Sequence, residues 1–130
     1  MATGNGQFTM SKILIAEDQD DLREMIAQTL QLSGYEVVSS QDGEHAYQQA
    51  KSLQPDLIIL DYELPGLNGR QVCKKLKSLD AFTETPIVMI SSYGNQRYLE
   101  RSLEAGAKEF IRKPFELSHL IERVDSLLAA

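Results

Sequence analysis

The chain alternates between two kinds of segment, and this alternation restricts its fold more than any other feature. Five short runs are largely apolar without interruption, as expected of strands whose two faces are both covered. They occupy residues 13–16, 35–38, 57–60, 87–90 and 110–111. The segment after each run repeats apolar residues every three or four positions, as helices do. Five strands alternating with five helices predict an α/β fold: an open, doubly wound parallel sheet with right-handed crossovers and helices on both faces.

Local residues mark where the predicted helices begin and end. Asp21, with Glu24 three residues later, resembles a capping box for the first helix. Asp42 can cap the second helix, and Pro55 prevents it from continuing. The apolar stripes expected to face the core are Leu22, Met25, Ile26, Thr29 and Leu30; Ala46, Tyr47, Ala50 and Leu53; Val72, Cys73, Leu76 and Leu79; Leu99, Leu103 and Ala107; and Leu117, Leu120, Ile121, Val124, Leu127 and Leu128.

Composition and charge limit the class of protein. The chain has 130 residues, of which 42% are hydrophobic and 25% charged, and this size fits one globular domain. Its net charge of −6 argues against direct binding to nucleic acid, which needs a basic surface. No apolar run approaches the roughly 20 residues of a membrane span, and no signal peptide is recognisable. We therefore expect a cytoplasmic protein that does not insert into membranes.

The ends of the domain and the lone cysteine complete this outline. Residues 1–10 are uncharged and lack a helical period, which predicts a flexible leader or cloning remnant, with Met10 as an alternative start. The domain itself is expected to span residues 11–130. Cys73 alone cannot form an internal disulfide or a cysteine-rich zinc site, and its apolar stripe predicts a place in the core.

Polar residues end four of the five predicted strands. Glu17 and Asp18 follow the first strand, Asp61 ends the third, Ser91 ends the fourth and Lys113 follows the fifth. Each has an ordinary structural explanation when considered alone: a solvated loop that caps a helix, a turn, a local hydrogen bond or a surface lysine. Because ligands of such sheets bind at the carboxyl ends of the strands, we expect these side chains to share one cleft.

The chemistry of this cleft points to a metal ion and a phosphoryl group. Three carboxylates repel one another and favour a hard divalent cation with oxygen ligands, Mg²⁺ above all, with Mn²⁺ as a substitute. No histidine or cysteine cluster is present that would favour zinc or copper. A carboxylate beside a metal and a lysine can attack a phosphoryl group and form an aspartyl phosphate. The metal and Lys113 would neutralise charge on the phosphoryl oxygens, and Ser91 would donate a hydrogen bond.

Four motifs together resemble the receiver domain of two-component response regulators. The length of the chain is similar to that of the stand-alone chemotaxis regulators. The motifs are residues 12–18 (KILIAED), 56–69 (DLIILDYELPGLNG), 86–92 (PIVMISS) and 106–115 (GAKEFIRKPF), and the resemblance extends over about residues 11–129. It implies a flavodoxin-like (β/α)5 fold with strand order 2-1-3-4-5. It also implies that Asp61 is the phosphoacceptor.

The resemblance implies a metal site around the phosphoacceptor. Asp18 would bind Mg²⁺ directly, Glu17 mainly through water, and the backbone carbonyl of Glu63 would complete the protein ligands alongside Asp61. Glu17 stands where the family more often has Asp. Lys113 would bind the phosphoryl group, and the peptide bond that follows it, to Pro114, is often cis in this family.

The resemblance also implies a switch. Ser91, where the family usually has Thr, would turn toward the phosphoryl group, and Phe110, where the family has Tyr or Phe, would swing inward behind it. Glu63 and Tyr93 would flank the path of the attacking water and tune how long the phosphoryl group survives. The surface of the fourth helix, fifth strand and fifth helix would then change, and candidates on it are Tyr98, Arg101, Lys108 and Arg112.

The function that follows is a phosphorylation-dependent signalling switch in a two-component system or phosphorelay. The donor would be a phosphohistidine on a sensor histidine kinase or a histidine phosphotransfer domain, and the switch would control a protein target that the sequence does not identify. Such a domain is not an enzyme acting on other molecules, because it catalyses only its own phosphorylation and dephosphorylation.

Three alternatives share parts of this pattern. A phosphatase of the haloacid-dehalogenase class also uses an aspartyl phosphate, but it expects a second Asp where Glu63 stands. A flavodoxin-type FMN carrier shares the fold, yet acidic residues follow the first strand in place of a phosphate-binding loop, and no GxGxxG or P-loop motif is present. A degenerate receiver would act as a constitutive protein-interaction module. The presence of Asp18, Asp61, Ser91 and Lys113 together disfavours it.

Overall fold

Five parallel strands form one sheet in the order β2-β1-β3-β4-β5, which confirms the predicted fold and strand order. The computed structural model describes residues 10–129, so the predicted leader lies, apart from Met10, outside the described residues. The strands and helices follow one another as β1 (Lys12–Ala16), α1 (Asp20–Leu32), β2 (Glu36–Ser40), α2 (Gly43–Leu53), β3 (Leu57–Asp61), α3 (Gly69–Lys77), a 3-10 turn η2 (Asp80–Phe82), β4 (Ile87–Ser91), α4 (Gln96–Glu104), β5 (Glu109–Arg112) and α5 (Leu117–Ala129).

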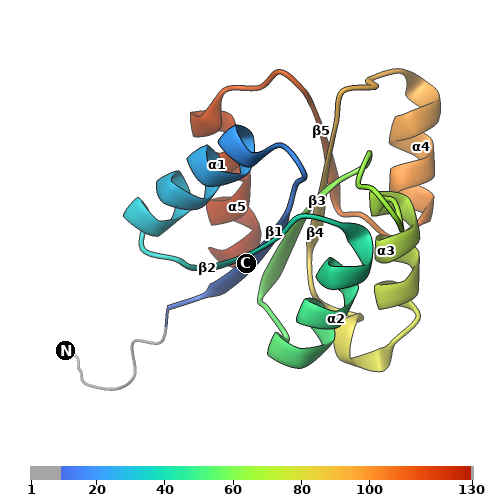
Figure 1. Cartoon of the computed structure of the whole chain (residues 1–130), viewed down its shortest axis with the longest axis horizontal. Coiled ribbons are helices and arrows are strands. Elements are labelled where there is room, and N and C mark those ends of the chain that lie inside the picture. Colours follow the sequence, from blue (N-terminus) through green and yellow to red (C-terminus); the bar gives the residue numbers. More distant parts are fainter. Residues whose placement is uncertain (1–9, 130) are drawn as a thin grey trace.

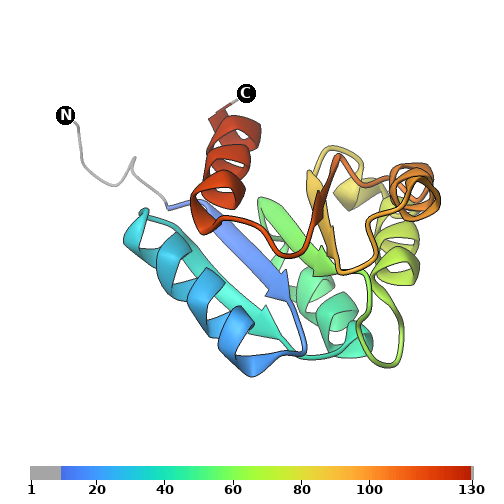
Figure 2. The same ribbon diagram turned by 90° about the horizontal axis from the view of Figure 1, so that it is seen from above.

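Helices cover both faces of the sheet and create two cores. Helices α1 and α5 lie on one face, and α2, α3 and α4 lie on the other (Figures 1 and 2). Neighbouring residues of a strand point to opposite faces, so Ile13 and Ile15 pack toward α1 and α5, while Leu14 and Ala16 pack toward α2 and α3. The central strands β3 and β4 are buried at every residue, which is why their sequences are continuously apolar up to their last positions. Within residues 10–129 no helix has the length and apolar character needed to cross a membrane.

Helix α1 begins two residues earlier than the predicted capping box requires. Its N-cap is Gln19, whose side chain makes no capping hydrogen bond, and Asp21 lies in the first turn, so the box at Asp21 is wrong. Arg23 stabilises this turn, because its guanidinium donates to the backbone carbonyl of Glu17 (2.8 Å) and to the carboxylate of Asp20 (2.6 Å). The helix therefore starts close to the end of β1. Asp42, in contrast, caps α2 as predicted by accepting from the His45 N–H (2.8 Å).

Helix α4 faces the core with a different stripe from the predicted one. Tyr98, Ser102 and Ala105 turn inward, whereas Leu103 is 46% exposed and Leu99 is half-buried. Ser102 can be buried because its hydroxyl donates to the backbone carbonyl of Tyr98 (2.8 Å), one turn earlier. The prediction was wrong for Leu103, whereas Ala107, just after the helix, is buried as predicted. Tyr98 also faces the core, where it makes the aromatic contacts described below.

Helix α3 starts directly against the end of β3, and a glycine makes this approach possible. A Cβ atom on Gly69 would lie 2.3 Å from the carbonyl oxygen of Asp61, so any side chain here would push the helix away. The helix start is stabilised by a reciprocal capping box between Asn68 and Gln71, with bonds of 2.9 Å in both directions. The loop that carries Glu63 is thus held closely at both ends.

Lys77 joins the end of α3 to the segment that leads into β4. Its ammonium donates to the backbone carbonyls of Phe82 (2.9 Å) and Thr85 (2.6 Å), in a half-buried position. These carbonyls belong to the turn around η2, where the Phe82 carbonyl also accepts from the Thr85 N–H (3.2 Å), so Lys77 adds a second, charged donor to this turn. The contact ties the end of α3 to the segment just before β4.

We expect the Lys77→Met substitution to destabilise the fold by about 1–3 kcal/mol, because it removes a charged donor from carbonyls that are partly shielded from water. Lys74→Met, on the exposed side of the same helix, is the control and should change stability by less than about 0.5 kcal/mol. Urea denaturation of the two variants measures the difference. Equal stabilities would show that Lys77 is an ordinary surface lysine.

Candidate functional site

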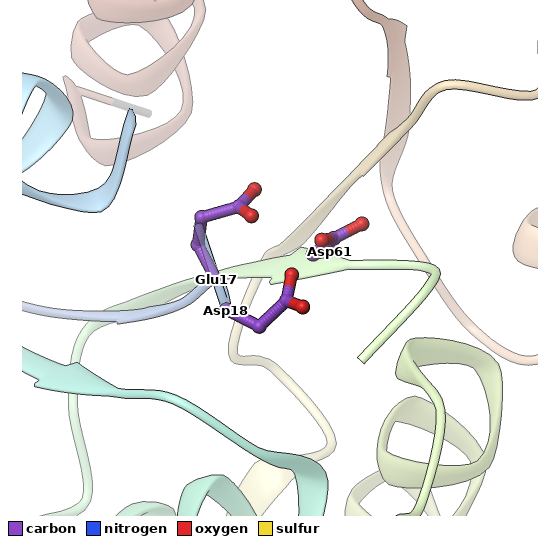
Figure 3. A group of neighbouring side chains, drawn as sticks. All are labelled: Glu17, Asp18 and Asp61. Carbon is purple, nitrogen blue, oxygen red and sulfur yellow. The ribbon is translucent and has the colours of Figure 1, made fainter. Parts of the chain in front are cut away.

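Three carboxylates meet at the carboxyl edge of the sheet. Asp61 is the last residue of β3, and Glu17 and Asp18 follow β1 directly, so that the three side chains lie side by side (Figure 3). One oxygen from each lies within 4.8 Å of the others. Glu17 and Asp61 are buried, at 0% and 1% exposure, whereas Asp18 is exposed to solvent. The site is therefore a buried pair of acids with a third acid at its mouth.

Lys113 is the cation that balances the buried pair. Its ammonium lies 2.9 Å from Glu17 Oε1 and 3.3 Å from Asp61 Oδ2. The backbone of β4 holds it in place, because the Lys113 N–H donates to the Ser91 carbonyl (2.7 Å), and the peptide bond to Pro114 is cis. Burial alone would lower the pKa of Lys113, but the close ionic contact with Glu17 and the charge of Asp61 outweigh it and raise the pKa above its ordinary value.

One ammonium does not neutralise the site. Burial raises the pKa of Asp61 to about 7. The Glu63 N–H, which donates to Asp61 Oδ1 (3.0 Å), and the charge of Lys113 lower it, while the charges of Glu17 and Glu63 raise it. Because the acids outnumber the cation, an additional positive charge would stabilise ionised Asp61.

The residues present fit a hard divalent cation. Glu17 Oε1 is buried and makes no hydrogen bond of good geometry, although Lys113 lies near it as a charge partner. Asp18, Asp61 and Lys113 line a cleft of about 190 Å³ that opens to solvent, together with Gln19, Glu63, Ser92 and Tyr93. All of the available anionic ligands are oxygens, which is the donor set of Mg²⁺.

Ser91 is buried at the end of β4, and its hydroxyl is already engaged. It donates to one carboxylate oxygen of Glu63 and accepts from the Tyr93 N–H (3.0 Å). The second carboxylate oxygen of Glu63 accepts from the Ser92 N–H (3.0 Å). Sequence reasoning placed Glu63 beside the path of water and missed this contact. The available signal was that Glu63 and Ser91 both lie at the ends of β3 and β4, which are paired neighbours.

A chain of three tyrosines connects the site to α4. Tyr62, next to Asp61, meets the ring of Tyr98 edge-on, with 5.0 Å between ring centroids. Tyr98 in turn stacks on Tyr93 at 5.1 Å. Tyr98 is thus half-buried between two rings rather than a simple surface residue, and it packs against the core. The sequence offered only the presence of three tyrosines, without their partners.

The other predicted switch residues lie on or near β5. Phe110 is partly buried against the core beneath α3 and α4, in register with Met89 of β4. Arg112 packs over Gly94, where an added Cβ would lie 2.1 Å from its Cδ. Arg101 is half-buried and Lys108 exposed.

The sequence matches a family model described as the response regulator receiver domain over residues 13–125. Among curated proteins, it is 35% identical over 116 residues to the phosphate regulon transcriptional regulatory protein PhoB of Pseudomonas aeruginosa, covering 89% of this chain and 51% of that protein. It is also 35% identical over 117 residues to the alkaline phosphatase synthesis transcriptional regulatory protein PhoP of Bacillus subtilis, covering 90% and 48%. The chain spans about half the length of these relatives.

Solved structures share the fold closely. The chemotaxis protein CheY4 of Vibrio cholerae superposes with a TM-score of 0.87 at 29% identity, covering 92% of this chain and all of that one. The signal receiver domain of a signal transduction histidine kinase from Syntrophus aciditrophicus superposes with a TM-score of 0.85 at 32% identity, covering 92% and 90%.

The raised pKa of Asp61 predicts a pH-dependent cost to stability in the absence of metal. The folded protein holds the Asp61 proton up to about pH 7, whereas the unfolded chain releases it near 3.8, so this group's stabilising contribution is complete below pH 4 and is lost as the pH rises to 7. We expect Asp61→Asn to be more stable than the wild type by about 2 kcal/mol at pH 8. The difference should shrink as the pH falls toward 4.

Urea denaturation in the presence of EDTA, at pH 8 and at successively lower pH, measures this difference. Asp21→Asn is the matched control, because Asp21 is an exposed acid in the first turn of α1. A less stable Asp61→Asn variant at pH 8 would contradict the electrostatic description of the site.

Proposed function

The chain belongs to the response regulator receiver family, and from this we propose that it is a phosphorylation-dependent switch whose phosphoacceptor is Asp61. One observation carries the proposal: a buried carboxylate at the end of β3 lies 3.3 Å from the Lys113 ammonium, within a cluster of acids suited to a divalent cation. A nucleophile, a cation for the phosphoryl oxygens and metal ligands are thus together in one open cleft.

The proposed step transfers a phosphoryl group from a phosphohistidine to Asp61. A carboxylate oxygen of Asp61 forms a bond to phosphorus as the phosphorus–nitrogen bond of the donor breaks. The bonding electron pair leaves with the imidazole nitrogen, which can then take up a proton. Lys113 stays within reach of the transferred oxygens and offsets their charge.

The metal in this proposal is Mg²⁺, or Mn²⁺ in its place. Asp18, Asp61 and the backbone carbonyl of Glu63 would bind it directly, and Glu17 mainly through water. Once bound, the ion would neutralise charge on the phosphoryl oxygens and on the acids around it. Lys113 remains paired with Glu17 and so orients the buried side of the site.

The proposed output is a change in the surface formed by α4, β5 and α5. Ser91 would turn toward the phosphoryl group, and Phe110 would move into the space behind it. The chain of Tyr62, Tyr98 and Tyr93 supports this route, because it joins the site to α4 by direct ring contacts. Tyr93, at 54% exposure beside the cleft, would shield the phosphoryl group from water, and Glu63 would tune the same step.

The phosphoryl donor would be a sensor histidine kinase or a histidine phosphotransfer domain, met in the cytoplasm. A partly apolar cleft of about 500 Å³ adjoins the site and shares Lys113 and Ser92 with it. Leu22 and Met25 of α1 line one side, and Phe115 and Leu117 line the other. A donor that delivers its histidine to Asp61 must cover this area, so the cleft supports docking of an apolar helix face there. The downstream partner is a protein, and direct nucleic-acid binding and membrane insertion form no part of the proposal.

Acetyl phosphate with Mg²⁺ tests the phosphoacceptor role without a kinase. We expect the mass of the intact wild-type protein to rise by one phosphoryl group, because a small acyl phosphate can enter the open cleft. Asp61→Asn should show no such increase, while Asp56→Asn should behave like the wild type. An unmodified wild type, or equal modification of Asp61→Asn, would instead support a degenerate receiver that acts as a constitutive interaction module.

Mg²⁺ should stabilise the folded protein through the same carboxylates. At a free concentration one hundred times its dissociation constant, an ion that binds only the folded state adds about 2.7 kcal/mol and raises the melting temperature. Asp18→Asn should reduce this effect, and Asp21→Asn, three positions further along the chain and exposed, should leave it intact. Thermal melts with and without Mg²⁺ measure it. An equal response of wild type and Asp18→Asn would exclude Asp18 as a ligand.

A further inference from the structure

We propose that the Glu63 carboxylate is a positioning residue that holds Ser91 in the unphosphorylated arrangement, by occupying the hydrogen-bond donors that a phosphoryl group on Asp61 requires. The proposal rests on the proposed function and adds to it what keeps the switch off. We call the two bonds that Glu63 accepts, from the Ser91 hydroxyl and the Ser92 N–H, the Glu63–Ser91 contact.

The stoichiometry of the hydroxyl makes this contact exclusive. A serine hydroxyl has one proton, so Ser91 can donate to Glu63 or to a phosphoryl oxygen, but not to both. One of its two lone pairs is used as well, since the Tyr93 N–H donates to Ser91 Oγ (3.0 Å). Ser91 is fully buried, so water does not readily replace a partner that leaves. In the unphosphorylated state, the Ser91 hydroxyl is therefore already hydrogen-bonded to Glu63 and to the Tyr93 N–H.

Glu63 occupies its position because two strand ends are adjacent. Its N–H donates to Asp61 Oδ1 (3.0 Å). Its side chain extends from the end of β3 to the end of β4, where it accepts hydrogen bonds from the Ser91 hydroxyl and the Ser92 N–H. Glu63 and Ser92 both line the cleft of about 190 Å³ that contains Asp61. A phosphoryl group in this cleft would compete for the same two donors.

Charge repulsion favours the phosphoryl group over the Glu63 carboxylate in this competition. Asp61 and Glu63 line the same small cleft, so negative charge added on Asp61 lies close to the Glu63 carboxylate. A phosphoryl group adds about two negative charges beside Glu63 and repels its carboxylate. Glu63 is only half-buried and can turn into solvent when it is displaced. Ser91 and the Ser92 N–H are then free to bind the phosphoryl oxygens.

Release of Ser91 has a defined path to the surface. The Ser91 hydroxyl binds the Tyr93 N–H, and the Tyr93 ring stacks on Tyr98 of α4. Rotation of Ser91 would therefore remove a hydrogen bond from the segment between β4 and α4. The Glu63–Ser91 contact links the chemistry at Asp61 to the position of this segment.

Beryllofluoride, a stable phosphoryl analogue, tests the proposal in the presence of Mg²⁺. We expect Glu63→Ala to bind beryllofluoride about tenfold more tightly than the wild type, because the competing acceptor of two donors is gone. The dissociation constants come from amide NMR titrations of the full chain. Glu84→Ala, which removes an exposed acid from the loop before β4, is the matched charge control and should bind like the wild type.

Ser91→Ala separates competition from simple charge repulsion. If Glu63 acts through Ser91, Glu63→Ala should improve binding by much less in the Ser91→Ala background, by about twofold or under. The amide resonance of Tyr93 should also shift in Glu63→Ala without any ligand, because its acceptor is released from Glu63.

The outcomes are distinct. Equal gains in both backgrounds would show repulsion alone and overturn the proposal, as would an unchanged affinity in Glu63→Ala. A wild type that binds no beryllofluoride and accepts no phosphoryl group from acetyl phosphate would instead remove the proposed function, and the Glu63 proposal with it.

Discussion

The burial of Glu17 and Asp61 beside one another, with the single ammonium of Lys113 between them, is the interaction on which the rest of this structure depends. Two adjacent buried carboxylates are costly, because each loses its hydration and each repels the other. Lys113 lies within 3.3 Å of both and compensates only part of this cost, which leaves Asp61 with a pKa of about 7. A site in this condition gains stability from any further positive charge.

The fold creates this condition through its topology. Strands β1 and β3 are neighbours in the centre of the sheet, so their carboxyl ends bring Glu17 and Asp61 together although 40 residues separate β1 from β3. Lys113 arrives from the far side of β4 and is held by the Ser91 carbonyl. Gly69 allows α3 to begin against the Asp61 backbone and thereby closes the loop that carries Glu63. Together these constraints leave the cleft at Asp61 open to solvent.

The fold and the three members of the carboxylate cluster could be predicted from the sequence. The fold follows from the spacing of apolar residues, and the cluster follows from the position of acids at the ends of strands. Continuous apolar runs require buried strands, and acids at the ends of parallel strands must share one edge. The inward face of α4 could not be predicted in the same way. Leu99 and Leu103 are the more apolar residues, yet Tyr98 is turned inward by ring contacts with Tyr62 and Tyr93, which are distant in sequence.

The Glu63–Ser91 contact was equally hidden from the sequence. Glu63 is a half-buried side chain with several accessible rotamers, and no hydrophobic pattern determines which of them it adopts. Only the geometry of two strand ends places its carboxylate on the Ser91 hydroxyl and the Ser92 N–H. The Ser91 hydroxyl, which would bind the phosphoryl group, is therefore already hydrogen-bonded to the Glu63 carboxylate.

The identity of the phosphorylated residue is the central claim, and borohydride trapping tests it most directly. Borohydride reduces an aspartyl phosphate to homoserine, so protein treated with acetyl phosphate and Mg²⁺ can be reduced, digested and sequenced by tandem mass spectrometry. The predicted result is homoserine at position 61 and at no other aspartate. Homoserine at position 18, or a phosphoryl group that survives on a serine, would contradict the assignment of Asp61 as the phosphoacceptor.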